Sequence, residues 1–347
     1  MAKRAKITVA GAGALGLTTA LALADAGHSV TVFDPASPLD NASGVAAGML
    51  APAFESVLDP AATPQLDLLL AARDLWPALE TRIGVVVDRA GAVAVGEADF
   101  LARADGGLRS LGLHPTDLAR KALEGLAPGL APTWGRGVLI REDWRIEAGA
   151  ALTALRAACE AAGVIFRQEP ARGFEGGERL VIATGAARDL AVVAPELSAL
   201  SPIKGHILRS QAYAYEGVVV RGEGAYVTAA PGAMTLGATM QPGRDDRDVD
   251  PEDVAPLLAA GARLFPQVAD GPYAASAGVR AATTDGLPMV GRGRHHGVLL
   301  AVGARRNGWL LAPLVARIIA ACVTEGEAGP YAQRLDPARF GMTSEAK

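Results

Sequence analysis

The stretch Gly11-Ala12-Gly13-Ala14-Leu15-Gly16 follows a short apolar run and opens an alanine- and leucine-rich segment that ends at Gly27. A second apolar run, residues 29–33, ends at Asp34. This order predicts a strand, a glycine turn, a helix and a second strand, the β-α-β unit that binds dinucleotides. The first glycine permits the turn, the second lets the backbone approach a pyrophosphate, and the third lets helix and strand pack closely.

The predicted helix presents free N–H groups and a partial positive charge to a phosphate at Gly13 and Ala14. Asp34 stands 34 − 11 = 23 residues after Gly11. An acid accepts the ribose hydroxyls at an offset of about 20 residues in this unit. The negative charge disfavours NADP, whose extra phosphate it would repel, and it leaves NAD and FAD open.

Composition limits the remaining classes. The chain has 347 residues, is 50% hydrophobic and carries a net charge of −4, which predicts two domains and no nucleic-acid partner. Cys159 and Cys322 both occupy apolar helical positions, which indicates buried thiols, no disulfide framework and a cytoplasmic location. The apolar segment 309–323 contains Arg317 and is shorter than the roughly 20 residues of a membrane span, so none is expected.

A second segment, Gly303-Ala304-Arg305-Arg306-Asn307-Gly308, again lies between an apolar run and a helical pattern. It places cationic side chains and a helix N-terminus far along the chain from the first glycine turn. Together the two segments suggest a flavin dinucleotide held from both ends. A helix beginning at Gly308 would direct its dipole at the flavin edge that becomes negative on reduction. An ordinary amphipathic helix after a charged loop is the alternative.

The pattern between these segments predicts an α/β fold of α+β two-domain type. It consists of a Rossmann-like FAD-binding domain with an inserted antiparallel β-rich substrate domain. We expect residues 1–82, 142–200 and 278–347 in the first domain, and residues 83–141 and 201–277 in the second.

Local signals fill in this outline. Residues 36–62 lack periodicity and predict an ordered loop, after which Thr63-Pro64 would cap a helix. Residues 83–141 predict short strands at 84–87, 92–95 and 137–140. A helix is expected at 148–162, and a buried strand with a tight turn at 180–185. Residues 201–277 predict strands interrupted by one helix, which begins at Asp250-Pro251.

Five segments resemble, in order, the flavin-dependent amine oxidases of the D-amino-acid oxidase type, and among them the glycine oxidases of thiamine biosynthesis. The segments are Ala42–Pro52, Asp143–Ile146, Val181–Gly185, Gly278–Arg280 with Thr284–Gly291, and Arg306–Gly308 with Leu310–Pro313. The resemblance spans residues 6 to about 324. It implies FAD as the cofactor and glycine or a similar small amine as the substrate.

The resemblance also implies individual contacts. Arg280 would grip the substrate carboxylate with its planar fork, and Arg306 would line the other side. Tyr226 and Met49 would lie beside the substrate. The residues expected to contact FAD are Gly11, Gly13, Ala14, Gly16, Asp34, Ser43, Ala46, Ala47, Gly48, Met49, Ala171, Thr184, Gly185, Arg306, Asn307, Gly308, Trp309 and Leu310.

The implied reaction moves a hydride from the α-carbon of a neutral amine to flavin N5 without a protein base. Dioxygen would then form hydrogen peroxide, and water or a thiazole-forming partner would take the imine. No metal is expected, since no HExxH pattern occurs and His295-His296 lies in a predicted loop. A homo-oligomer is compatible with the sequence. Alternatives are a D-amino-acid or sarcosine-type oxidase, a quinone- or carrier-linked dehydrogenase, an NAD-dependent dehydrogenase, and a flavin-binding scaffold without activity.

Two departures from the family pattern stand out. Ala281 follows Arg280 where relatives often have proline, and Ala304-Arg305 stands where relatives often have an aromatic residue or histidine. The second departure adds a charge and removes a wall residue. It would shift the preference among glycine, sarcosine and small D-amino acids.

Overall fold

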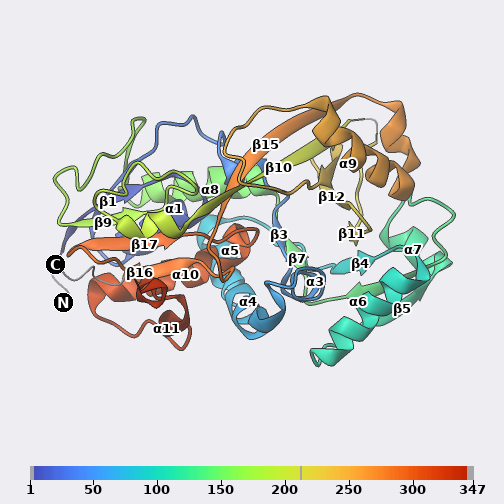
Figure 1. Cartoon of the computed structure of the whole chain (residues 1–347), viewed down its shortest axis with the longest axis horizontal. Coiled ribbons are helices and arrows are strands. Elements are labelled where there is room, and N and C mark those ends of the chain that lie inside the picture. Colours follow the sequence, from blue (N-terminus) through green and yellow to red (C-terminus); the bar gives the residue numbers. More distant parts are fainter. Residues whose placement is uncertain (1–3, 212, 342–347) are drawn as a thin grey trace.

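The computed structural model describes residues 4–211 and 213–341 and contains two large sheets, one at the left and one in the right half of Figure 1. The first sheet has six strands in the order β16-β17-β9-β1-β2-β8. Its strands are β1 Lys6–Ala10, β2 Ser29–Phe33, β8 Ile165–Arg167, β9 Arg179–Ile182, β16 Met289–Arg292 and β17 Val298–Val302. Strand β1 runs parallel to both β2 and β9, which confirms the predicted β-α-β unit.

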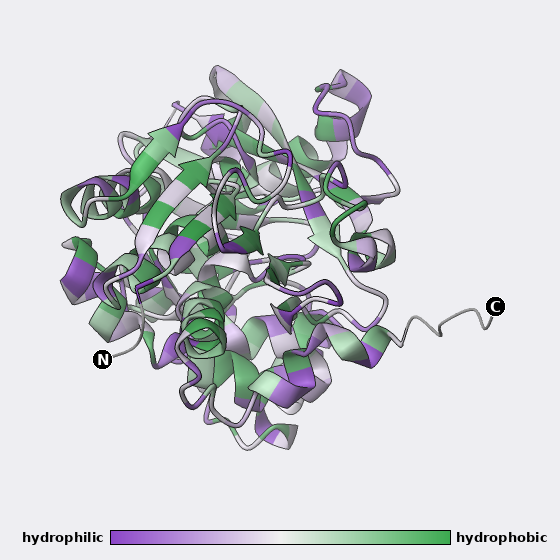
Figure 2. Ribbon diagram, turned by 90° about the vertical axis from the view of Figure 1, so that its left-hand side faces the viewer, coloured by the Kyte–Doolittle hydropathy of each residue, from purple (hydrophilic) through white to green (hydrophobic). Residues whose placement is uncertain are grey.

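Three helices predicted from the sequence pack on this sheet. They are α1 Ala14–Asp25, α8 Ala148–Ala161 and α10 Gly308–Thr324. Leu17 and Leu21 of α1 share one hydrophobic core cluster with Val315 and Ile319 of α10. Each such buried side chain contributes about 1.5–3 kcal/mol. Figure 2 shows the hydrophobic colour on the central strands and the hydrophilic colour on outlying helices and loops.

The second sheet has nine strands and only one parallel pair, β4 with β11. Its order is β14-β10-β13-β12-β11-β4-β6-β5, with β15 paired to β10. The strands are β4 Ala92–Ala94, β5 Thr116–Ala119, β6 Arg136–Ile140, β10 Ser201–Ser210, β11 Val219–Arg221, β12 Tyr226–Ala230, β13 Ala233–Gly237, β14 Gln241–Pro242 and β15 Tyr273–Ala282. Helix α9, Pro251–Leu264, begins as predicted, because the Asp250 carboxylate accepts the N–H of Glu252 at 2.9 Å.

The prediction of a loop at 36–62 is wrong. The segment contains α2 Ala42–Val45, β3 Met49–Leu50 and α3 Pro52–Leu58. Each of these elements is too short to show a sequence period. Helix α3 also depends on a distant partner, because Asp143 accepts the N–H groups of Ala53 and Phe54 at 2.7 and 3.1 Å.

Residues 83–141 are not strands alone. They include α6 Ala98–Ser110 and α7 Arg120–Leu126, besides β4, β5 and β6. Helix α6 buries Phe100, Ala104 and Leu108, a four-residue spacing that Gly106 and Gly107 obscure in the sequence. The strand expected at 84–87 does not form.

Thr63 does not cap a helix. It begins a short 3₁₀ turn, η1 Thr63–Gln65, and its hydroxyl donates to the Ser56 carbonyl oxygen at 2.7 Å. Two helices follow where one was expected, because the chain turns before the Trp76-Pro77 pair. The remaining elements are α4 Leu66–Arg73, α5 Trp76–Ile83, β7 Trp144–Arg145, η2 Pro195–Ala199, η3 Pro266–Asp270, α11 Ala332–Leu335 and η4 Pro337–Phe340.

Strand β15 of the second sheet runs across residues 277 and 278, where a domain boundary was expected. Residues 1–3 and 342–347 of the expected ranges lie outside the described residues. Cys159 is a buried free thiol, as predicted, whereas Cys322 is a free thiol that is only half-buried. Within residues 4–211 and 213–341, no helix is both long and apolar enough to cross a bilayer.

Candidate active site

The glycine turn has the geometry that its sequence predicts. Gly11 adopts φ +108°, and a Cβ atom placed there would lie 2.3 Å from the carbonyl oxygen of Ala183 at the end of β9. A Cβ atom on Gly16 would lie 2.0 Å from the carbonyl oxygen of Gly11. Both positions therefore exclude a side chain, and α1 packs directly against the turn.

The N-terminus of α1 is open to an anion. Among the described residues, the amide N–H groups of Leu15 and Gly16 have no hydrogen-bond acceptor. The N–H of Ala14 donates to the hydroxyl of Ser43 at 3.0 Å, and a Cβ atom on Gly13 would lie 3.1 Å from that hydroxyl. Free helix N–H groups beside a bare glycine backbone fit a diphosphate.

Asp34 lies at the same edge of the sheet, at the end of β2. Its carboxylate accepts the N–H of Ala12 at 2.6 Å and of Ala36 at 2.8 Å. Asp34 also lines a cavity of about 380 Å³ together with Arg167 and Gln168. This cavity adjoins the glycine turn, where the adenosine half of a dinucleotide would lie.

The N-terminus of α10 meets the same region. A Cβ atom on Gly308 would project into open space, and the Trp309 indole N–H donates to the Ser43 carbonyl oxygen at 3.0 Å. Ser43 thus contacts α1 through its hydroxyl and α10 through its backbone. The two glycine segments, distant in sequence, are joined through Ser43, and we expect an extended FAD to lie along the path between them.

Four other residues expected to contact the cofactor have the following surroundings. Gly185 forms a turn with φ +63°, and Thr184 donates to the Ala187 carbonyl oxygen at 3.1 Å. Leu310 has a fully buried side chain, so only its backbone could reach a ligand. Ala171 packs against a hydrophobic cluster, and the cavity beside Asp34 is lined by its neighbour Gln168 instead.

A second cavity collects most of the residues expected at the substrate and the flavin ring. From this group it is lined by Ala46, Ala47, Gly48, Met49, Tyr226, Arg280, Arg306, Asn307 and Trp309. They come from the segment between α2 and β3, from strands β12 and β15, and from the start of α10. The cavity therefore lies between the second sheet, the segment 42–55 and the start of α10.

Two glycines make room for the polar side chains of this cavity. A Cβ atom on Gly205 would lie 1.9 Å from Nη1 of Arg280, and one on Gly237 would lie 2.1 Å from the hydroxyl of Tyr226. Strands β10 and β13 therefore carry glycine where these side chains cross them. Burial lowers the pKa of the Arg280 guanidinium and raises the pKa of the Tyr226 hydroxyl.

Sequence reasoning missed a buried carboxylate in the cavity wall. Glu55 of α3 accepts from Arg221 Nη2 at 2.9 Å and from Arg306 Nη2 at 3.1 Å, and Arg306 Nε lies 3.1 Å from its other oxygen. The Glu55 and Arg221 side chains are only 6% and 4% exposed. Burial raises the pKa of Glu55, but the guanidinium groups of Arg306 and Arg221 outweigh it and hold the pKa below its ordinary value.

Asp143 supports this carboxylate from behind. It caps α3 and is almost fully buried. Burial raises its pKa to about 7, opposed by Arg221 and by the two helix N–H groups, while the Glu55 charge adds to the rise. The matched Asp143-Trp144 segment therefore has a structural role, which is to hold the helix that carries Glu55.

Arg305, the unusual residue of the closing segment, is also paired. It has φ +50° and forms an ion pair with Asp59, which follows α3. Glu55 and Asp59 stand four residues apart and hold the consecutive residues Arg306 and Arg305. The charge that departs from the family pattern is therefore compensated inside the protein.

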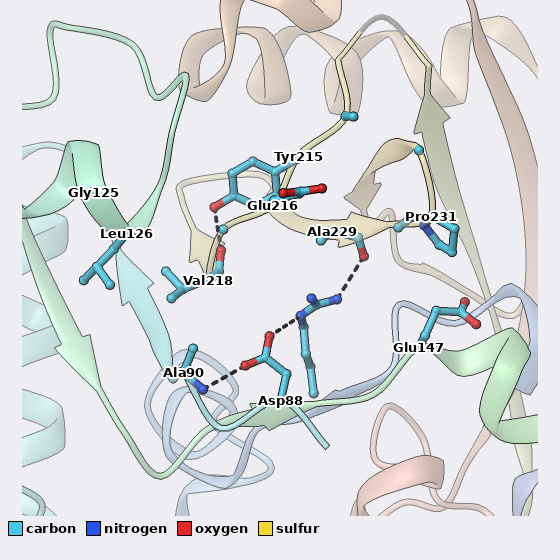
Figure 3. Close-up of a pocket in the computed structure, with 15 residues that line it drawn as sticks. Asp88, Ala90, Gly125, Leu126, Glu147, Tyr215, Glu216, Val218, Ala229 and Pro231 are labelled. Atoms are coloured by element: carbon cyan, nitrogen blue, oxygen red, sulfur yellow. Dashed lines mark hydrogen bonds and ion pairs between the residues drawn. The ribbon is translucent and has the colours of Figure 1, made fainter. Parts of the chain in front are cut away.

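A third cavity, of about 580 Å³, is separate from this site (Figure 3). There Asp88 pairs with Arg145 at 3.0 Å, and Arg145 also donates to the Ala229 carbonyl oxygen. None of the residues expected at the substrate or the cofactor lines it. Across the described part of the chain, no group of three or more His, Cys, Asp or Glu residues could hold a metal ion.

Comparison with known proteins identifies the family of this chain. The family model "FAD dependent oxidoreductase" (DAO) matches residues 6–322. Glycine oxidase of Geobacillus kaustophilus is 30% identical, with 99% of this chain and 98% of that protein covered. The crystal structure of glycine oxidase from Geobacillus kaustophilus superposes with a TM-score of 0.81 at 27% identity, covering 96% of this chain and 99% of that one.

A further relative is longer. The "Bifunctional protein ThiO/ThiG" of Trichormus variabilis is 28% identical over 96% of this chain, which spans 55% of that protein's length. The family model, in contrast, covers nearly the whole chain. The chain therefore belongs to the DAO family of FAD-dependent oxidoreductases.

Proposed function

We propose that this enzyme oxidises glycine or a similarly small amino acid, using FAD and dioxygen. The observation that carries the proposal is Arg280. Its guanidinium faces the cavity at the flavin end of the cofactor path, and its one hydrogen bond among the described residues is a long one, 3.4 Å, to the Thr239 carbonyl oxygen. An uncompensated, desolvated guanidinium is suited to bind a substrate carboxylate in a bidentate pair.

The walls of the cavity favour a small substrate. The cavity has a volume of only about 70 Å³, and Gly205 has no side chain, so the Arg280 guanidinium can lie against its backbone. The Tyr226 hydroxyl lies beside Gly237 and could donate to the bound carboxylate. Holding the carboxylate at two points orients the α-carbon and lowers the entropy cost of reaction.

FAD, when bound, supplies the acceptor for the α-hydride and passes the electrons on to dioxygen. The protein contributes orientation and electrostatics. We expect the α1 N-terminus to bind the diphosphate and the α10 N-terminus at Gly308 to stabilise negative charge on the ring edge. Met49 and Trp309 line the cavity with apolar surface and limit access of water.

The imine formed from glycine would be hydrolysed to glyoxylate and ammonia or passed to a thiazole-forming enzyme. Support for a role in thiamine synthesis comes from relatives that are named as bifunctional ThiO/ThiG proteins. In those relatives, the part similar to this chain is covalently linked to a second activity, which suits a reactive product.

The purified holoenzyme tests the proposal directly. Under air, glycine should yield hydrogen peroxide, ammonia and glyoxylate in equal amounts. Reduction of an artificial dye without peroxide would favour the quinone- or carrier-linked dehydrogenase. If sarcosine or D-alanine is turned over in preference to glycine, the proposed reaction stands and the assigned substrate is wrong. NADH formation would refute the assignment.

A further inference from the structure

Two arginines line the candidate substrate cavity, Arg280 and Arg306, and a third, Arg221, binds Glu55 of the cavity wall; the three differ in how their charge is compensated. Arg221 and Arg306 share the Glu55 carboxylate, at 2.9 to 3.1 Å. Arg280 has no carboxylate within ion-pair distance among the described residues. Two guanidinium groups, Arg280 and Arg306, thus face one cavity, but only the first is available to an anion.

The geometry of Arg306 explains why it is unavailable. Its Nη2 donates to Glu55 Oε1 at 3.1 Å, its Nε lies 3.1 Å from Oε2 as part of the same ion pair, and its Nη1 lies 3.6 Å from the sulfur of Met240. A hydrogen bond between two ionised groups is stronger than one between neutral groups, and here it is joined by a second ion-pair contact. All three nitrogens of Arg306 are therefore directed at protein atoms.

Glu55 is held firmly in this position. Its side chain is buried, helix α3 is capped by Asp143, and Arg221 binds the same carboxylate from the sheet. Because the arginines hold its pKa below the ordinary value, Glu55 stays ionised throughout the neutral and alkaline range.

We propose that Glu55 is a specificity-determining positioning residue, which withdraws Arg306 from substrate binding and so restricts the cavity to substrates with one anionic group. A second carboxylate on the substrate would meet the charge of Glu55 and find no free guanidinium. Without Glu55, Arg306 would face the same cavity uncompensated and would bind that second carboxylate. The inference deepens the proposed function and rests on it.

The test compares ligands that differ in charge and hardly in size. Iminodiacetate carries two carboxylates, and its monoamide carries one. In the wild-type holoenzyme, we expect the kcat/KM of the monoamide to exceed that of the diacid at least tenfold. Glu55→Gln keeps the shape of the side chain. In this variant the ratio of kcat/KM for the diacid to kcat/KM for the monoamide should rise at least tenfold, mainly because KM for the diacid falls.

Asp59→Asn is the matched control, because it removes the carboxylate partner of Arg305 only four residues away and outside the cavity wall. Its diacid-to-monoamide ratio should stay within twofold of the wild type. An unchanged ratio in Glu55→Gln would overturn the proposal. So would equal shifts in both variants, which would show a general effect of lost negative charge.

A binding measurement keeps the test independent of turnover and of the variant's folding. Malonate and its monoamide are titrated into the wild-type holoenzyme, and the perturbation of flavin absorbance is followed. The proposal expects the monoamide to bind at least tenfold more tightly, and equal or tighter binding of malonate would contradict it. Failure of the proposed function would give a different result: no small amine would reduce the flavin of the wild-type enzyme.

Discussion

The cofactor edge and the substrate wall of this enzyme are built in contrasting ways. At the edge, backbone groups act: the bare turn at Gly11, the N–H groups of α1 and the N-terminus of α10. At the wall, buried charged side chains act, with Glu55 between Arg221 and Arg306. The backbone groups at the edge come from two segments of residues that are consecutive in sequence, whereas the charged side chains at the wall come from residues that are far apart in sequence. Substitutions at the edge should therefore reduce FAD binding, whereas substitutions at the wall should reduce substrate binding.

The largest effect is expected at the cofactor edge. In Gly13→Val, a branched side chain would enter the space where Cβ already lies 3.1 Å from the Ser43 hydroxyl. It would block the approach of the diphosphate to the backbone. We expect the ratio of bound FAD to protein to fall at least tenfold, measured by absorbance after gel filtration.

Gly106→Ala is the control for this change. Gly106 lies in α6, where an added Cβ would meet nothing within 4 Å, so FAD content should not change. Stability should rise by up to about 1 kcal/mol, because alanine favours the helix. Normal FAD content in Gly13→Val would remove the glycine turn from the cofactor site.

At the substrate wall, Arg280→Met should leave FAD bound and weaken the binding of the substrate. Loss of a buried charge-assisted pair costs about 2–5 kcal/mol, so kcat/KM for glycine should fall by roughly 10²–10³, chiefly through KM. Steady-state kinetics with measured FAD content checks this. Arg136→Met, at a side chain that is 74% exposed, should behave as the wild type. An unchanged KM in Arg280→Met would exclude Arg280 from substrate binding.

Asp143, which caps the helix that carries Glu55, should make the stability of the protein depend on pH. Its pKa is raised to about 7 from an ordinary 3.8, so between these values only the unfolded chain releases the proton. The wild type therefore loses stability as pH rises through this range, and Asp143→Asn does not share this loss. The stability advantage of wild type over variant should shrink by about 2–3 kcal/mol between pH 5 and pH 8.

Denaturant unfolding at the two pH values measures that difference. Because the pKa is raised in the folded state, the advantage must be greater at pH 5. A difference that stays constant, or that grows toward pH 8, would show that Asp143 is ionised in the folded protein.

The smallest effect is expected at Gly205→Ala. The added Cβ would overlap Nη1 of Arg280, at 1.9 Å, and would displace the guanidinium without removing it. The KM for glycine should rise about tenfold, which corresponds to about 1.4 kcal/mol. In an Arg280→Met background the same change should add almost nothing. Additive effects would indicate that Gly205 acts on the cavity by another route.

The same contrast explains what the sequence could reveal. Strands β1, β2, β9 and β17 and helices α1, α8 and α10 follow local period and capping signals, and all were predicted. Helix α3 was missed because seven residues carry no period, and its cap, Asp143, stands 90 residues away from Ala53. Helix α6 was missed because two glycines weaken its pattern.

For the candidate site, the sequence predicted the two glycine segments and the Arg280 segment, and the second cavity is lined by Arg280, Arg306 and Asn307 but by no residue of the Gly11–Gly16 turn. Glu55 was not, since its partners Arg221 and Arg306 stand 166 and 251 residues along the chain. The one available signal was the unusual Arg305-Arg306 pair, whose adjacent charges require acidic partners. Finding those partners needed the fold.

The most direct test of the central claim is anaerobic titration of the FAD-loaded enzyme with glycine. If the α1 and α10 N-termini hold the flavin and Arg280 holds the carboxylate, the oxidised flavin absorbance should bleach fully in wild type. In Arg280→Met, bleaching should require at least a hundredfold more glycine. A flavin that glycine and other small amines leave oxidised in the wild type would contradict the account.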